Sequence, residues 1–164
     1  MNPTPTEEFI RTLQALKPGD LGRLRNLTDL ALDESVDGFD LFAGLWWPLR
    51  QKNQKAPRRQ VAWLIAKLYA FRPLAQTSGA TLALLLGGVH IHIQDKQTKG
   101  RHQQRFDELL LLPLAQIEPA LRWGLTQIAD NGKGLDWVRL TDDLSIWERE
   151  QTRLKWSGEF LGLI

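Results

Sequence analysis

The chain has 164 residues, of which 43% are hydrophobic and 24% are charged, a composition typical of a folded globular protein. It contains no cysteine, which excludes disulfides, thiolate metal sites and cysteine nucleophiles. Its 21 basic and 19 acidic residues give a net charge of +2, and no run of about 18 uncharged apolar residues is present, so a membrane-spanning helix is not expected.

The first half of the chain is predicted to form helices. The opening residues lack the basic-then-apolar pattern of a secretion signal, so we expect a cytoplasmic protein with no membrane contact. Thr4 suits an N-cap with Pro5 in the first helical position, and Asp20 is predicted to cap a short second helix. An acidic loop is expected at residues 33–38. Helical periodicity predicts helices at residues 5–16, 21–27, 39–49 and 57–72.

The second half is also predicted to be helical. Gly87 and Gly88 are expected to end a short helix, and residues 89–101 are interpreted as a loop or a short extended segment. Helices are predicted at residues 81–86, 105–112, 117–129, 136–144 and 145–161, with a turn at 131–134. The fold class is therefore all-α: one domain over residues 1–164, a compact bundle of about eight to nine helices. It could divide into an N-terminal lobe, 1–86, and a C-terminal lobe, 102–164.

Enzyme motifs are missing from the sequence. There is no P-loop, no dinucleotide-binding glycine motif and no nucleophile elbow, so we expect neither an enzyme nor a cofactor. A metal-dependent hydrolase using His90, His92 and His102 is kept as an alternative, although surface or half-buried histidines explain this pattern more simply. The adjacent acids Asp142 and Asp143 are interpreted as caps of the following helix.

The net charge of +2 conceals an uneven distribution. Residues 1–40 hold eight acids and four bases, residues 41–94 hold seven bases and no acid, and residues 95–164 hold ten bases and eleven acids. Five of the seven central bases fall within ten residues: Arg50, Lys52, Lys55, Arg58 and Arg59. A basic segment of this kind favours contact with a phosphate backbone or with an acidic protein surface.

Helical spacing suggests how these bases are presented. Arg59, Trp63 and Lys67 recur every four residues and predict a basic and aromatic outer face, on which Trp63 could stack a base. The alternative is a solvated face from which Trp63 packs on a neighbouring lobe. Arg149 and Arg153 are similarly spaced in the last predicted helix. Among the other tryptophans, at most one of Trp46 and Trp47 is expected to be fully buried. The core or a copy-to-copy interface is expected to hold Trp137, Trp147 and Trp156.

Several short segments, in order along the chain, resemble the CasB family, the small subunit of the type I-E CRISPR Cascade complex. The strongest is LDWVRLTDDLSIW at residues 135–147, followed by WSGEF at 156–160. The earlier matching segments are LKPGDLGRLR at 16–25, GATLA at 79–83, RFDELL at 105–110 and LR at 121–122. The resemblance covers about residues 10–160 and is specific through the order and spacing of its motifs.

The resemblance implies a non-catalytic, all-α subunit of an RNA-guided antiviral complex. Its expected partners are the backbone and large Cascade subunits, a second copy of itself, the crRNA–target DNA hybrid and the displaced non-target DNA strand. Sequence readout would belong to guide pairing, so backbone contacts suffice. Family DNA-contact positions fall on Arg58, Arg105, Arg122 and Arg153, and more weakly on Arg59 and Arg149; the central segment adds Lys52, Lys55 and Lys67. A structural adaptor that docks on acidic proteins without touching nucleic acid is the alternative.

Overall fold

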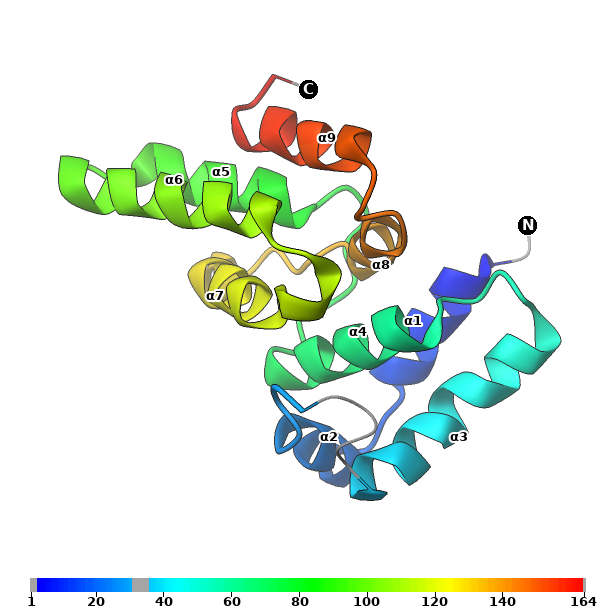
Figure 1. The fold of residues 1–164 in the computed structure, drawn as a ribbon. Helices are drawn as coiled ribbons and strands as arrows, with labels where there is room; N and C mark the ends of the chain where they lie inside the picture. The colour runs from blue at the N-terminus through cyan, green and yellow to red at the C-terminus, as the bar shows by residue number, and fades with distance from the viewer. Residues whose placement is uncertain (1–2, 31–35, 164) are drawn as a thin grey trace.

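The computed structural model describes residues 3–30 and 36–163, and over these residues it is all-α, with nine α-helices and two short 3₁₀ turns (Figure 1). The helices are α1 (Pro5–Gln14), α2 (Pro18–Arg25), α3 (Val36–Lys52), α4 (Arg59–Phe71), α5 (Leu82–His92), α6 (Lys96–Leu111), α7 (Glu118–Ile128), α8 (Trp137–Ser145) and α9 (Glu150–Phe160). The 3₁₀ turns are η2 (Leu114–Gln116) and η3 (Ala129–Asn131). The all-α prediction is confirmed. No helix in the described part of the chain is long and apolar enough to cross a bilayer.

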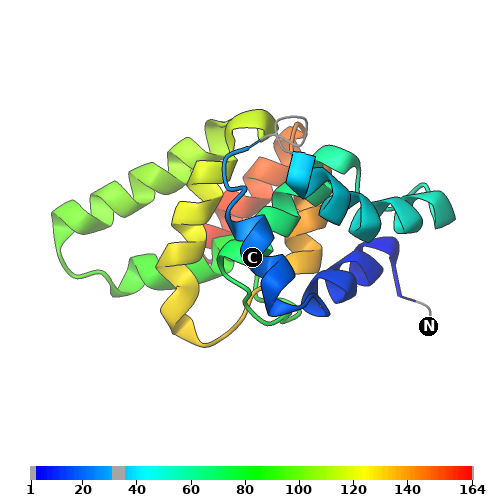
Figure 2. The same ribbon diagram turned by 90° about the horizontal axis from the view of Figure 1, so that it is seen from below.

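Helix α4 lies in the middle of the bundle and packs against α2, α3, α7 and α8. In Figure 1, α1 to α4 lie together at the lower right, α5, α6, α7 and α9 lie at the upper left, and α8 lies between the two groups. Helix α5 packs along α9, and α6 runs beside α5 as a protruding pair in the view from below (Figure 2). The division into two lobes stays a prediction; its boundary at residue 86 would fall inside α5.

Local signals place the first two helices. The hydroxyl of Thr4 accepts a hydrogen bond from the backbone N–H of Glu7 at 3.1 Å, and Pro5 begins α1, as predicted. The predicted cap at Asp20 is wrong, because α2 begins at Pro18 with Lys17 as its N-cap residue. Proline suits the first turn since its missing N–H would have no helical partner there.

The predicted loop at residues 89–101 is wrong. Helix α5 continues through Gly87 and Gly88 to His92, and α6 begins at Lys96 after Asp95, which accepts from the backbone N–H of Thr98 at 2.9 Å. The two glycines do not end the helix. At Gly87 the absence of a side chain instead allows α5 to approach the backbone of Phe160 on α9. The structural role of Gly87 is therefore visible only from this long-range contact.

The predictions for α3 and α8 need two corrections. Residues 36–38 of the predicted loop belong to α3, while residues 33–35 lie outside the described part of the chain. Asp142 and Asp143 do not cap the next helix, because both lie inside α8. Asp142 instead accepts a hydrogen bond from the Thr6 hydroxyl at 2.8 Å, which ties α8 to α1. Although Asp142 is exposed, partial desolvation raises the pKa of its carboxyl, and the Thr6 hydrogen bond acts in the opposite direction.

The tryptophans are buried or exposed as predicted. Trp46 is buried and donates from Nε1 to the carbonyl of Pro57 at 2.6 Å, whereas Trp47 is 51% exposed. The hydrophobic core contains Trp137, Trp147 and Trp156, with Trp147 and Trp156 packed edge to face at 5.0 Å. Each of these rings buries a large apolar area and donates its N–H to a partner, as buried tryptophans usually do.

Candidate nucleic-acid interface

Six accessible basic side chains lie at the end of α3, in the α3–α4 loop and at the starts of α4 and α9, and a contact between α4 and the residue before Arg149 groups them as one surface. We call it the α4–α9 basic surface, and its residues are Lys52, Lys55, Arg58, Arg59, Arg149 and Arg153. One contact joins its two ends: Nη2 of Arg58 lies 3.3 Å from Oε1 of Glu148, directly before Arg149. The structure therefore brings together residues that are about ninety positions apart in the chain.

The cations of this surface are weakly neutralised. The Arg58–Glu148 pair is open to solvent, with side-chain exposures of 45% and 65%, and Lys52 lies 4.0 Å from Glu8. Exposed ion pairs of this kind contribute about 0–1 kcal/mol, so they exchange readily for a phosphate. Arg59 and Arg149 are exposed and form no ion pair with another described residue. Glu150 is the other acid at this end of α9.

Two of the helices at this surface begin in an unusual way. The N-cap residue of α4 is Arg58 and that of α9 is Arg149, and neither side chain caps the helix by a hydrogen bond. Ser, Thr, Asp and Asn are the preferred N-caps because their oxygens accept from the free backbone N–H groups. Arginine has no acceptor, so each helix presents its positive end and a guanidinium at the same place.

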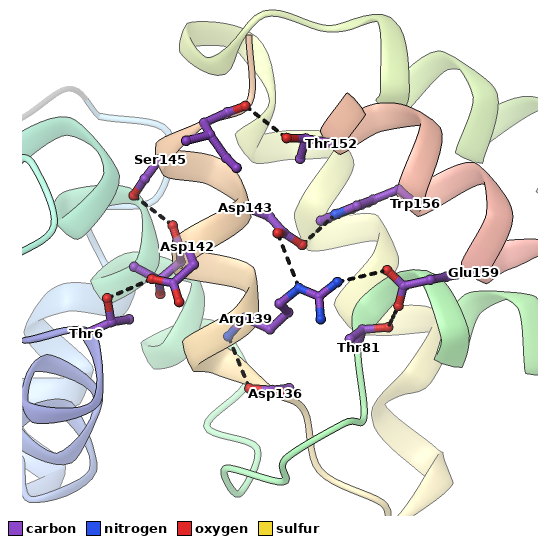
Figure 3. Close-up of polar contacts among 12 residues, drawn as sticks. Thr6, Thr81, Asp136, Arg139, Asp142, Asp143, Ser145, Thr152, Trp156 and Glu159 are labelled. Carbon is purple, nitrogen blue, oxygen red and sulfur yellow. Dashed lines mark hydrogen bonds and ion pairs between the residues drawn. The ribbon is translucent and has the colours of Figure 1, made fainter. Parts of the chain in front are cut away.

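A buried polar network holds α9 in position (Figure 3). Arg139 of α8 bridges Oδ1 of Asp143 at 3.3 Å and Oε1 of Glu159 at 3.4 Å. Glu159 accepts from the Thr81 hydroxyl at 2.5 Å, and Asp143 accepts from Nε1 of Trp156 at 2.8 Å. The network joins α8, α9 and the residue that caps α5, and so it fixes the direction of the helix that carries Arg153 and that Arg149 precedes.

Arg153 is positioned by its neighbours as well as by its helix. Its Nε donates to the carbonyl of Trp147 at 3.2 Å, and its guanidinium carbon lies 5.9 Å from the centre of the Trp147 ring. These contacts order the side chain, which is partly exposed, and leave its two terminal nitrogens able to donate to a ligand. A pre-ordered arginine loses less conformational entropy when it binds a phosphate.

The predicted outer face of α4 is wrong. Trp63 and Lys67 are both only 4% exposed, because that side of α4 is covered by α7 and by the residues that follow α2. Nζ of Lys67 lies 2.5 Å from Oε1 of Glu118 and donates to the carbonyl of Leu30 at 2.8 Å. Lys67 is therefore a buried structural cation, and Trp63 is not available to stack a base.

Arg122 is engaged in a second structural ion pair. Its Nη2 lies 2.6 Å and 2.7 Å from the two carboxylate oxygens of Asp29, a residue with a positive φ of 68°. The backbone N–H of Asp29 also donates to Glu118 at 2.9 Å. Arg122 lies on α7 and does not join the α4–α9 basic surface, so its role in DNA contact stays a prediction.

Arg105 belongs to a third location, between α6 and α7. It is exposed, and its guanidinium carbon lies 5.0 Å from the centre of the Trp123 ring. Arg105 lines a cleft between α6 and α7 together with Arg101 and Trp123, two residues that the sequence reasoning missed. Arg101 and Arg105 are one helical turn apart, and this signal is visible only once residues 96–104 are recognised as helix.

The histidines do not form the group that a metal site needs. His90 and His92 lie on α5, so their side chains point about 160° apart around the helix, and they do not share a side as they would on a strand. His90 stacks on His102 with ring centres 5.6 Å apart, and His102 also packs against Trp123 and Phe160. In the described ranges, no group of three or more His, Cys, Asp or Glu residues is placed to hold a metal ion.

This histidine stack makes the fold sensitive to acid. Burial lowers the pKa of His102 and so does the charge of His90; burial and then Lys99 lower the pKa of His90. Because the unfolded chain takes up these protons at a higher pH, stability is complete above a pH of about 6.5 and is lost as the pH falls toward the folded pKa values. We expect the melting temperature to fall between pH 7.5 and 5.5.

Variants test whether the loss of stability at low pH comes from the His90–His102 stack. His102→Leu should flatten the dependence of melting temperature on pH over the same interval. His92→Gln, at an exposed position on α5, should leave it unchanged. Circular dichroism melts at three pH values measure all three proteins, and equal slopes for the wild type and His102→Leu would contradict the assignment.

Comparisons with known proteins agree with this fold. A family model, CRISPR-associated protein Cse2, matches residues 20–160. The structure resembles CasB of M. ruber with a TM-score of 0.74, at 23% identity over 98% of this chain and 94% of that one. It also resembles a CRISPR-associated Cse2-family protein of Thermus thermophilus (TM-score 0.69, 24% identity, 98% and 99% covered) and CasB of Thermobifida fusca (0.66, 17%, 95% and 95%). A search of curated protein sequences gives no significant match.

Proposed function

The chain belongs to the Cse2 family of CRISPR-associated proteins, and from this we propose that it is a non-catalytic small subunit of a type I-E Cascade surveillance complex. In this role it binds DNA backbones without reading their sequence. It stabilises the R-loop formed by the crRNA and its target, and it holds the displaced non-target strand. Sequence recognition is left to the guide RNA, as in other RNA-guided systems.

The α4–α9 basic surface is the observation that supports this proposal best. Arg58 and Arg149 occupy the N-cap positions of two helices, so each arginine directly precedes backbone N–H groups that its own side chain does not cap. Phosphate binds well at such helix starts, and arginine binds it in a bidentate geometry. The positive region is extended along the chain by Arg59, by Lys55 of the α3–α4 loop and by Lys52 at the end of α3. Such a surface suits a strand held by its backbone.

Protein partners would dock on other parts of the molecule. We propose the backbone and large Cascade subunits and a second copy of this chain as those partners. Trp47 on α3 and Leu154 on α9 are 51% and 62% exposed, and Leu161 and Leu163 follow at the end of α9. Large apolar side chains in contact with water are typical of surfaces that other subunits cover.

Charge reversal tests the DNA contact. We expect the double variant Arg58→Glu, Arg149→Glu to bind DNA more weakly and with a shallower salt dependence. Each lost phosphate contact lowers the slope of log K against log salt by about 0.7 for a single strand and about 0.9 for a duplex. Fluorescence anisotropy with labelled single- and double-stranded DNA over a series of salt concentrations gives both quantities.

A charge reversal at a distant exposed position helps to separate a local effect from an effect of net charge. Lys133→Glu changes the charge in the same sense at an exposed position in the turn before α8, and it should leave the slope near that of the wild type.

In the assembled complex the double variant Arg58→Glu, Arg149→Glu should also shorten the R-loop lifetime and expose the non-target strand to nuclease. A double variant with the wild-type slope and wild-type strand protection would refute the assignment. Wild-type protein that binds no DNA at low salt would favour the adaptor alternative.

A further inference from the structure

An open cleft of about 400 Å³ lies between α6 and α7, on a different part of the molecule from the α4–α9 basic surface. Its walls include Arg101, His102, Gln104, Arg105, Trp123 and Gln127. The volume falls at the lower end of the range of pockets that accept small organic ligands. The chemistry of its walls indicates which ligand.

The cleft combines positive charge with an aromatic face. Arg101 and Arg105 are one turn apart on α6, and the guanidinium of Arg105 lies over the partly exposed ring of Trp123, 5.0 Å from its centre. The one acid in the wall, Glu108, accepts a hydrogen bond from Gln104 at 3.2 Å. A planar group that replaces the Arg105 guanidinium over the indole, with an anion between the two arginines, would satisfy both features at once.

The floor of the cleft holds a polar group without a partner. His102 is 5% exposed, and neither of its ring nitrogens has a hydrogen-bond partner among the described residues. Because burial lowers the pKa of His102, its imidazole is neutral at pH 7 and offers one donor and one acceptor. A buried polar group without a partner is destabilising, so this floor favours an occupant with polar edges.

We propose that the cleft binds one unstacked nucleotide of a single strand, with its base against Trp123 and its phosphate between Arg101 and Arg105. The proposal rests on the proposed function and extends it, because it adds a contact to a base where the α4–α9 basic surface contacts the backbone alone. Every base has a π-face, so such a contact tolerates any sequence. Amides of Gln104 and Gln127 lie within the same wall and can pair with base edges.

Abasic DNA distinguishes a base contact from a phosphate contact. The probes are an oligothymidylate of about 12 nucleotides, within the site size of single-strand binders, and an abasic strand of the same length. Stacking one base on an aromatic side chain is worth about 1–3 kcal/mol, so the wild type should bind the intact strand at least about fivefold more tightly. Trp123→Leu should lose this preference and keep its affinity for the abasic strand.

Two further variants make the test specific. Trp123→Phe keeps an aromatic face and should retain part of the preference, and it also guards against misfolding of Trp123→Leu, which circular dichroism would reveal. Arg58→Glu, on the other surface, should weaken binding of both strands by the same factor. Quenching of tryptophan fluorescence by the intact strand should be smaller in Trp123→Phe than in the wild type.

The outcomes separate the two proposals. Equal affinity of the wild type for intact and abasic strands would overturn the cleft assignment and leave the proposed function standing. A loss of affinity for the abasic strand in Trp123→Phe would overturn it as well, because the ring would then act through the fold. Failure of the wild type to bind either strand would overturn both proposals.

Discussion

Gly87→Ala should unfold at a markedly lower temperature than the wild type. A Cβ atom at this position would overlap the carbonyl oxygen of Phe160 and lie 3.0 Å from its carbonyl carbon and 3.1 Å from its Cα. These are backbone atoms of α9, so they cannot move aside as a flexible side chain could. Forcing extra volume into a packed site costs about 1–3 kcal/mol, or roughly 2–10 °C for a domain of this size.

Gly88→Ala is the matched control one residue away on the same helix. Nothing lies within 4 Å of a Cβ at Gly88. Alanine is a better helix former than glycine by about 0.5–1 kcal/mol, so this variant should melt slightly above the wild type. Thermal melts followed by circular dichroism compare the three proteins. If Gly87→Ala proved as stable as Gly88→Ala, the close approach of α5 to α9 would be wrong.

This glycine also shows what the sequence could and could not predict about the fold. Some local signals predict the structure correctly: the cap at Thr4, Pro5 after it, and the helical periodicity of residues 61–68. Gly87 and Gly88 were misinterpreted as a helix end because helix-ending glycines and close-packing glycines are identical in sequence. What distinguishes them is Phe160, which is more than seventy residues away.

The candidate nucleic-acid interface shows the same limit, because local sequence does not reveal long-range contacts. The acid-free segment correctly indicated a basic surface at Arg58 and Arg59, which are exposed. Spacing alone placed Lys67 on the same outer face, although the structure shows it buried beside Glu118. Periodicity finds the faces of a helix that carry apolar residues, but α4 lies in the middle of the bundle and is covered on its polar side too. Which charged residue is buried depends on the neighbours that fold over it.

The Lys67–Glu118 pair should be among the most sensitive positions in the chain. The two side chains are 4% and 13% exposed, and Nζ and Oε1 lie 2.5 Å apart. The same ammonium donates to the carbonyl of Leu30, and the other oxygen of Glu118 accepts from the backbone of Asp29. The pair therefore joins α4 and α7 to the residues that follow α2.

Removing one partner leaves the other charge buried without compensation. We expect Lys67→Met to lower the free energy of unfolding by about 3–5 kcal/mol, the usual cost of breaking a buried ion pair. Glu118→Leu should cost a similar amount, while the double variant should cost much less than the sum, because neither charge then remains uncompensated. Denaturant unfolding of the four proteins gives this coupling energy directly.

The exposed pair on the α4–α9 basic surface provides the contrast. Arg58 and Glu148 are 45% and 65% exposed, so Arg58→Ala should change stability by no more than about 1 kcal/mol.

For DNA binding we expect the reverse order of effects. Lys67→Met, measured below its unfolding transition, should bind DNA with the salt dependence of the wild type, while Arg58→Ala should bind with a shallower salt dependence. A shallower slope for Lys67→Met would mean that Lys67 reaches a phosphate after all. An additive double variant would mean that Lys67 and Glu118 do not interact. The two measurements together therefore test which cations of the central basic segment belong to the fold and which belong to DNA.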